Sequence, residues 1–284
     1  MFNFLLPSKI IKARLPFLFF WIYISTQPGC GSWTGNPPKD DPKNLGTVSL
    51  AITGSEASTQ LLASSIPIIS KSGVQIGSMV ISQAKVALKG IKFKQVGGEI
   101  GEEETFAGPY AVDLLTNTVT PALNSIQLSS GFYKDIQLQL HKLESEEISD
   151  VAKTDPLVNN SIYLTGTYSP NNGSSVNITL KVDVSEEVSL MNPDASSPGV
   201  EVKDGSELKV IIAFRMDKWF DFTGREYDFS SLNGTSAVLA DAGGETGKKL
   251  QEIVKENIKK SAKFGEDADG DGTLGKDEDN DSLD

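Results

Sequence analysis

The sequence predicts a mainly β protein, an antiparallel β-sandwich with one amphipathic helix near the C-terminus. Three observations lead to this fold class. Apolar and polar residues alternate with a period of two over many short stretches, turn residues separate these stretches, and a convincing helical period occurs in one segment alone. Short strands at this spacing, without helices between them, are typical of an antiparallel sandwich.

The first segment of the 284-residue chain resembles a signal peptide, which we expect to cover residues 1–29. Lys9, Lys12 and Arg14 precede the apolar run 15–24. This run is too short to cross a bilayer, because a spanning helix needs about 20 apolar residues. Its length suits the apolar core of a signal peptide, so the sequence predicts export.

The one cysteine of the chain, Cys30, follows this segment directly. Residues 25–30 resemble a bacterial lipobox, in which the cysteine is acylated and becomes the new N-terminus. Gly29 fits this pattern, whereas Gln27 stands where an aliphatic residue is usual. We therefore expect lipidation at Cys30 and membrane attachment through this anchor; an ordinary secretory signal with a spare thiol is the alternative. Gly31 rather than Asp follows the cysteine, which favours the outer membrane or cell surface, on the periplasmic or extracellular face.

A flexible tether is expected at residues 30–45, because glycine, proline and charged residues dominate there. A β-sandwich domain is expected to follow at residues 46–143. Its alternation slips by one residue at Lys89-Gly90, and a slip at a glycine inside a strand predicts a β-bulge. The strands expected in this domain are 48–52, 84–93, 110–114 after a turn at Gly108-Pro109, and 136–140 after Gly131.

Residues 144–160 are polar and divide the expected strands into two groups. They are either a linker between two small β domains or a long crossover within one, and both arrangements stay open. A second β region is expected at 161–245. Its expected strands are 162–168, 176–184 and 208–214, with turns at 170–173 and 204–205.

Three stretches of the first domain carry a resemblance to a known kind of protein: AKVALKGIKFK (84–94), FAGPYAVDLL (106–115) and LSSGFYKDIQLQL (128–140). Together they resemble a secreted or lipid-anchored bacterial β-sandwich family of unknown function. The resemblance covers about residues 46–143 and lies in strand and turn patterns. It implies a fold and a location, and it implies no activity.

One amphipathic helix is expected at residues 246–264. The spacing of its apolar residues gives the helix one apolar face. The basic residues of its last turns complement the negative end of the helix dipole. The apolar positions are Leu250, Ile253, Val254, Ile258 and Ala262, and the basic ones are Lys259, Lys260 and Lys263.

The acidic tail, residues 265–284, contains a match to the twelve-residue calcium loop D-x-D-x-D-G-x₅-E of EF-hands. Ca²⁺ prefers about seven oxygen ligands, and alternate residues of a tight turn can supply them. The expected ligands are the carboxylates of Asp267, Asp269 and Asp271, the carbonyl of Thr273, and both oxygens of Glu278. In this pattern Gly272 permits the sharp bend and Leu274 packs inward.

This tail departs from a complete EF-hand. Gly265-Glu266 separates it from the expected helix, and the residues after Glu278 are too few for an exiting helix. Asp277, Asp279 and Asp281 are alternative ligands to Glu278 or ligands of a second ion. A solvated acidic tail that binds nothing is the other interpretation. If calcium binds, we expect modest affinity, about 10⁻⁴–10⁻³ M, and a structural role that includes capping the helix.

Other functions find less support in the sequence. The net charge of −12 and the lack of a basic block argue against a nucleic-acid partner. There is one histidine, His141, which argues against zinc, and no G-x-S-x-G motif, so we expect no enzyme. The alternative function is binding of a surface glycan or protein. The aromatic residues Trp219, Phe220, Phe222 and Tyr227 would then form either a sugar platform or part of the core.

Overall fold

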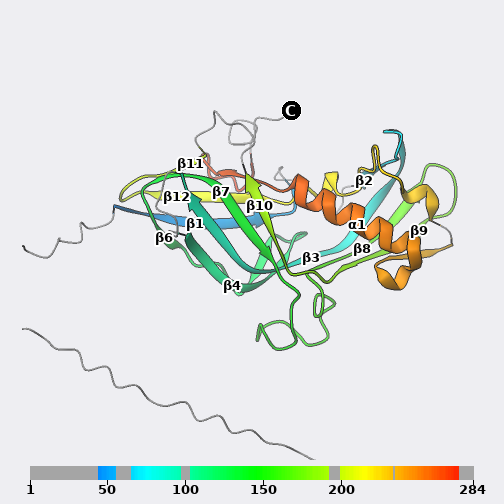
Figure 1. Ribbon diagram of the computed structural model, residues 1–284, viewed down its shortest axis with the longest axis horizontal. Coiled ribbons are helices and arrows are strands. Elements are labelled where there is room, and N and C mark those ends of the chain that lie inside the picture. Colours follow the sequence, from blue (N-terminus) through cyan, green and yellow to red (C-terminus); the bar gives the residue numbers. More distant parts are fainter. Residues whose placement is uncertain (1–43, 56–64, 97–102, 192–198, 233, 275–284) are drawn as a thin grey trace, which may run out of the picture. The chain divides into compact units, whose positions relative to one another are not determined.

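Two β-sheets and one long helix make up the described part of the computed structural model (Figure 1). The structure describes residues 44–55, 65–96, 103–191, 199–232 and 234–274, all within one unit of residues 42–284. The expected signal peptide, Cys30, the tether up to residue 43 and Glu278 lie outside the described residues.

The first sheet has the strand order β14-β12-β1-β6. Its strands are β1 (Leu45–Thr53), β6 (Ile126–Ser129), β12 (Glu207–Ala213) and β14 (Lys263–Glu266). One face of this sheet covers the core, where it buries Val48 and Ile52 of β1 and Val210 and Ile212 of β12.

The second sheet is larger and follows the order β10-β7-β3-β8-β9-β13. In addition, β11 pairs with β7, β2 and β4 pair with β3, and β5 pairs with β4. Its strands are β2 (Ser65–Ile69), β3 (Gln75–Gln95), β4 (Glu103–Asp113), β5 (Thr118–Thr120), β7 (Gly131–Leu140), β8 (Ile162–Pro170), β9 (Val176–Val182), β10 (Glu186–Met191), β11 (Val200–Val202) and β13 (Ser236–Leu239).

The long strand β3 organises the second sheet, and the predicted β-bulge within it is confirmed. The register of β3 with both β4 and β7 shifts between Leu88 and Gly90. A side chain at position 90 would be crowded, since a Cβ there would lie 3.1 Å from the Phe106 carbonyl oxygen and 3.2 Å from Gln139 Oε1. Glycine therefore lets two neighbouring strands approach the bulge closely.

The prediction that all strands are antiparallel is wrong for two pairs. β1 pairs with β12 in parallel, with Thr47 opposite Glu207, and β9 pairs with β13 in parallel. Antiparallel pairing follows when a tight turn joins two strands, and neither pair is joined in that way. Both sheets are therefore mixed.

The predicted turn at Gly108-Pro109 is also wrong, because β4 continues through both residues. β3 and β4 pair at Leu88–Tyr110 and again at Gly90–Ala107, so the two residues lie beside the bulge of β3. Here two residues of β4 lie opposite one residue of β3, so β4 includes Gly108 and Pro109 without ending.

Residues 144–160 connect β7 to β8, and both of these strands pair with β3. Strands from both expected regions are thus hydrogen-bonded within one sheet. Residues on either side of the connection also share the first sheet, where β12 pairs with β1. The connection has a small apolar cluster of its own, in which Leu143, Ile148 and Leu157 surround Ala87.

The helix α1 spans Gly244–Ser261 and therefore ends earlier than the predicted residue 264. Leu250, Val254 and Ile258 are buried, which confirms the predicted apolar face. Ala262 has an extended backbone, and the next residues form β14 along the open edge of β12. The sheet edge supplies hydrogen bonds that a continued helix would have made internally.

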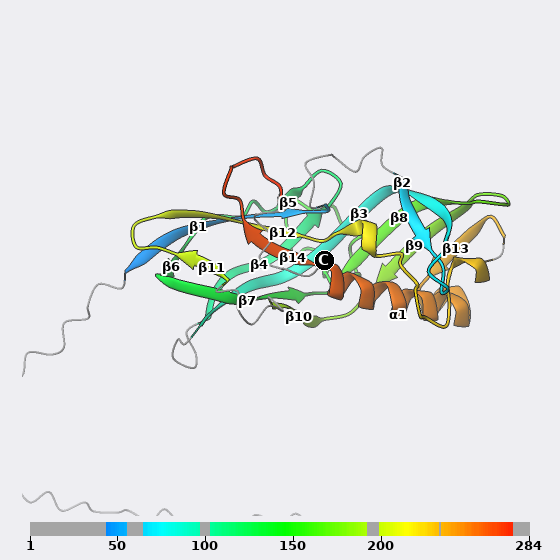
Figure 2. The same ribbon diagram turned by 90° about the horizontal axis from the view of Figure 1, so that it is seen from above.

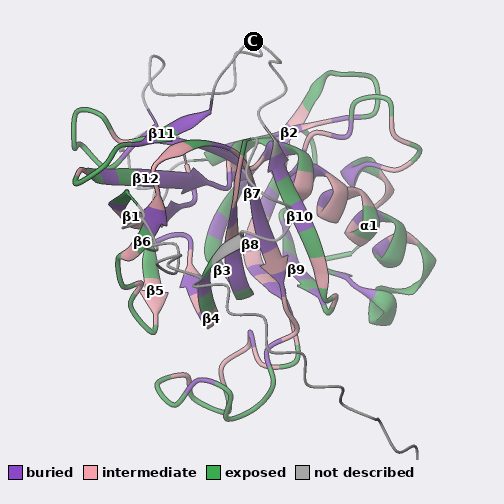
Figure 3. Cartoon of the chain, turned by 60° about the vertical axis from the view of Figure 1, so that its left-hand side comes forward, coloured by how far each residue is buried: buried purple, intermediate pink, exposed green. Residues whose placement is uncertain are grey.

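Among the described residues, the other helices are short 3-10 turns: η2 (Met216–Lys218), η3 (Phe229–Ser231) and η4 (Asp241–Gly243). The aromatic residues around η2 and η3 are core residues. Trp219, Phe220 and Phe222 are completely buried, and the Trp219 indole N–H donates to the Phe214 carbonyl at 2.7 Å. Figure 3 shows buried positions along strands of both sheets, for example along β3 and β12. Tyr227 is half-buried against the same core. Side chains inside the core cannot stack on a sugar, so Trp219, Phe220 and Phe222 cannot form the sugar platform.

One buried carboxylate, Asp228, ties two loops together at this end of the core, where it is 2% exposed. Its Oδ2 accepts from the Lys71 N–H at 2.9 Å, and its Oδ1 accepts from the Ser230 N–H at 2.9 Å. Burial, the largest influence, raises the pKa of Asp228, but the hydrogen bonds from Ser230 and Lys71 outweigh it. The pKa is therefore lowered from its ordinary value.

Candidate metal centre

The acidic loop, which we define as residues 267–274, begins where β14 ends. β14 runs antiparallel to β12, with Val210 opposite Glu266. The Asp267 N–H then donates to the Lys209 carbonyl at 3.0 Å, which continues the ladder by one residue. Figure 2 shows the chain leaving the sheet after β14 and turning outward from β12.

Three carboxylates converge in the acidic loop. Each of Asp267, Asp269 and Asp271 can place an oxygen within 4.8 Å of the corresponding oxygens of the other two. Asp267 is half-buried, and the other two are exposed. Like charges this close repel one another, and a cation between them would remove this repulsion. Carboxylate oxygens are also the ligands that hard cations such as Ca²⁺ prefer.

The same carboxylates fold the loop through bonds to its own backbone. Asp267 Oδ1 accepts from the Gly272 N–H at 3.3 Å, and Asp269 Oδ1 accepts from the Asp271 N–H at 3.0 Å. Asp271 Oδ1 accepts from both the N–H and the hydroxyl of Thr273, at 2.8 and 2.7 Å. These bonds turn the three side chains toward the inside of the loop.

Two glycines provide the bends that this winding requires. Gly272 has a φ of +79° and confirms the predicted sharp bend. Gly270 has a φ of +77°, which the sequence reasoning did not foresee. Both values lie in the left-handed region that glycine enters without steric cost. The alternation of Asp and Gly in residues 269–272 was the available signal.

Leu274 anchors the far end of the acidic loop, as predicted from its position in the motif. It is 6% exposed and packs on Ile211 and Ala213 of β12. These two side chains form a separate cluster, apart from the main core to which Val210 and Ile212 belong. The loop is therefore held by a hydrogen bond at Asp267 and by apolar packing at Leu274.

A lysine that the sequence reasoning missed lies beside the acidic loop. The Nζ of Lys209 is 3.7 Å from the place that a Cβ on Gly270 would occupy. Lys209 is adjacent to the loop only because β12 and β14 are neighbours, so no local pattern could have indicated it. Its ammonium group offsets part of the negative charge of the three carboxylates.

The predicted ligands fall into three groups. Asp267, Asp269 and Asp271 are brought together, while Thr273 is buried and bonded to Asp271. Glu278 lies outside the described residues, as do the alternative ligands Asp277, Asp279 and Asp281.

The predicted relation between helix and loop needs a correction. α1 ends at Ser261, and β14 stands between it and Asp267. A strand rather than a helix therefore leads into the loop, since Phe264 of β14 is buried in the core and holds the strand against β12. An ion held by the aspartates cannot cap α1 directly.

The other residues that the sequence singled out do not form a second metal centre within the described residues. His141 Nε2 contacts Glu147 Oε1 at 2.8 Å, and its ring is mostly covered. This contact is one cause of the lowered pKa of Glu147, which burial alone would raise. The pair joins the end of β7 to the connection 144–160.

No protein-family model, curated protein or solved structure matches this chain. The resemblance over residues 46–143 therefore stays a prediction. Within the described part of the chain, none of the helices combines the length and apolar character of a membrane-spanning helix.

Proposed function

We propose that the protein is a non-enzymatic calcium-binding lipoprotein of the bacterial cell envelope. The observation that carries the calcium part is the convergence of Asp267, Asp269 and Asp271 in a loop fixed at both ends. In this proposal the Thr273 carbonyl and Glu278 complete the oxygen shell, as in the sequence motif.

The role of the ion in this proposal is structural. The acidic loop packs on the outer side of β12 through Leu274, so an ion there would stabilise the edge strand β14 and the first sheet. Mass action sets the size of the effect. Calcium at ten times its Kd would add about 1.4 kcal/mol to the free energy of unfolding.

The location in this proposal follows from the N-terminal sequence. Acylation of Cys30 would anchor the protein, because each buried CH₂ of an acyl chain contributes about 0.8 kcal/mol to membrane attachment. Mass spectrometry of the chain purified from membranes tests this part. A mature N-terminus at Cys30 that carries acyl groups supports it, and an unmodified thiol contradicts it.

Calorimetric titration of residues 31–284 with calcium tests the metal centre. We expect binding with a Kd of about 10⁻⁴–10⁻³ M, and loss of that binding in the double variant Asp267→Ala with Asp271→Ala. The double variant should also melt at a lower temperature than the unchanged protein when calcium is present, and this difference should be much smaller in a calcium chelator.

A matched control separates a specific centre from general negative charge. Asp204→Ala with Glu252→Ala removes the same charge from exposed positions outside the acidic loop. This control should bind calcium like the unchanged protein. If the unchanged protein gives no binding heat up to several millimolar calcium, the proposed centre does not exist.

A further inference from the structure

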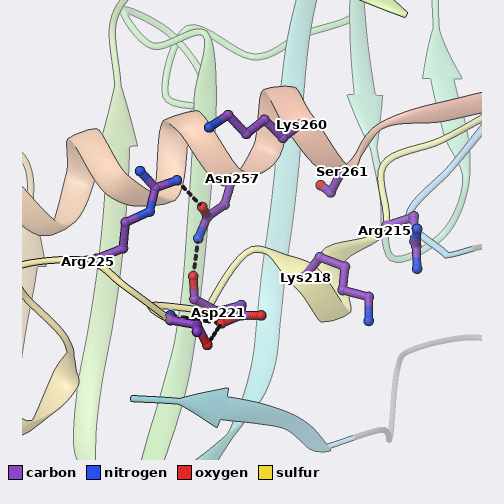
Figure 4. Close-up of a pocket in the computed structure, with 8 residues that line it drawn as sticks. Arg215, Lys218, Asp221, Arg225, Asn257, Lys260 and Ser261 are labelled. Atoms are coloured by element: carbon purple, nitrogen blue, oxygen red, sulfur yellow. Dashed lines mark hydrogen bonds between the residues drawn. The ribbon is translucent and has the colours of Figure 1, made fainter. Parts of the chain in front are cut away.

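A shallow hollow opens where the C-terminal end of α1 faces η2 and the loop that follows it (Figure 4). Its volume is about 280 Å³. Four basic side chains line it, Arg215, Lys218, Arg225 and Lys260, together with the acidic side chain of Asp221. We refer to it as the basic hollow.

The basic composition of the hollow contrasts with the net charge of the whole chain, which is −12. The whole sequence contains three arginines, and the two within the described residues, Arg215 and Arg225, both line this hollow. Lysine at the end of a helix is common because it complements the dipole, which accounts for Lys260. That effect does not account for two arginines from separate segments.

The guanidinium of Arg225 is held in place from the helix. Its Nη2 donates to Asn257 Oδ1 at 3.1 Å. Asn257 is 9% exposed, and its Nδ2 donates to the Trp219 carbonyl at 3.1 Å and to the Asp221 carbonyl at 2.7 Å. Figure 4 shows this amide between the helix and the loop. The contact uses one of the five N–H donors of Arg225. Because the guanidinium is already held in place, the side chain loses less conformational entropy when an anion binds.

Arg215 approaches the hollow from a strained turn. It follows β12 directly and has a left-handed backbone, with a φ of 38°. A left-handed backbone is sterically unfavourable for a residue other than glycine, and such residues are concentrated at functional sites. Figure 4 shows Arg215 and Lys218 toward one end of the hollow and Arg225 at the other end.

We propose that the basic hollow binds a phosphate group. Phosphate is negatively charged, so the four basic side chains attract it. Guanidinium groups also bind phosphate oxygens through paired N–H donors. A free phosphate ion and the phosphate of a lipid headgroup share this chemistry. The site is independent of the acidic loop and needs no metal.

Titration of the full chain with inorganic phosphate tests the proposal, in a neutral detergent and with calcium removed by a chelator. A second titration uses a short-chain phosphatidic acid below its micelle concentration, with short-chain phosphatidylcholine as the comparison. Binding heat and a shift of the Arg225 Nε–H nuclear resonance are the readouts. We expect phosphatidic acid or inorganic phosphate to give both, and a preference between them identifies the source of the phosphate.

Two variants locate the site. Arg215→Gln with Arg225→Gln should abolish binding, and Lys218→Gln with Lys260→Gln should weaken it at least about fivefold. The lysine pair is exposed, so it keeps the test valid if the arginine pair does not fold. Lys248→Gln with Lys255→Gln removes the same charge elsewhere on α1 and should leave binding unchanged. The proposal is wrong if neither phosphate compound binds, or if this control loses as much affinity as the lysine pair.

Discussion

The acidic loop and the basic hollow are the two concentrations of like charge considered above, and they are built in opposite ways. The loop consists of consecutive residues, and its side chains bond to its own backbone at Asp267, Asp269 and Asp271. The residues of the hollow come from the turn before η2, from η2 itself, from the following loop and from α1. A site of the first kind depends on local sequence, whereas a site of the second kind depends on the packing of the whole core.

This difference predicts that the framework of the hollow contributes more to stability than the aspartates of the loop do without calcium. Asn257→Ala would leave the carbonyls of Trp219 and Asp221 without the amide donor that they share. We expect the free energy of unfolding to fall by about 2–4 kcal/mol, measured by urea denaturation.

Two comparisons check this prediction. Glu252→Ala, at an exposed position of the same helix, should change the free energy of unfolding by no more than about 0.5 kcal/mol. Asp267→Ala with Asp271→Ala in a calcium chelator should cost clearly less than Asn257→Ala. An equal or larger cost would show that the acidic loop is itself part of the structural framework.

Asp228 sharpens the contrast, because it is a carboxylate that bonds to backbone N–H groups in the core instead of in the exposed loop. Its pKa is lowered on folding, so its contribution to stability is present above the unfolded pKa of about 3.9 and is lost as the pH falls through the folded pKa. Asp228→Asn should cost about 1–3 kcal/mol near neutral pH, because one new amide N–H would face the donors of Lys71 or Ser230.

Urea denaturation at several pH values measures this effect. The difference between Asp228→Asn and the unchanged protein should shrink once the pH falls below about 4. Asp150→Asn, at an exposed position, is the matched control and should have little effect at any pH. A difference that stays constant with pH would show that the charge of Asp228 is not the cause.

The smallest expected effect concerns the lysine beside the acidic loop. Lys209→Gln removes a positive charge close to the three carboxylates and should tighten calcium binding about two- to fivefold. Calorimetry measures this change, which should shrink as salt is added. Lys203→Gln, at an exposed position between β11 and β12, should leave the affinity unchanged. Weaker binding in Lys209→Gln would mean that Lys209 supports the loop instead of opposing the cation.

The sequence predicts the local features of this protein better than it predicts which strands pair with each other. The phase slip at Gly90 indicates the bulge, and the spacing of Leu250, Val254 and Ile258 indicates the buried face of the helix. The loop motif predicts the bend at Gly272 and the packing of Leu274. Each of these features is determined by residues within a few positions of one another.

Features that depend on distant residues could not be predicted in this way. The parallel pairing of β1 with β12 joins strands from opposite ends of the described chain. β14 is four residues long and continues the apolar spacing of α1, so its sequence alone does not separate it from the helix. The basic hollow needs the packing of α1 against η2 before Arg215 and Arg225 can line the same hollow.

The order of strands in the first sheet has a consequence for the assembly of the protein. β1 is synthesised early, but its parallel partner β12 comes late, and β14 is the last described strand along the chain. Such distant pairing closes slowly, because the intervening chain loses entropy when its ends meet. The backbone ladder that positions Asp267 exists only after β14 has docked on β12. A cation that needs this loop would therefore bind only after the sheet has formed. Its binding would shift the folding equilibrium toward the folded state.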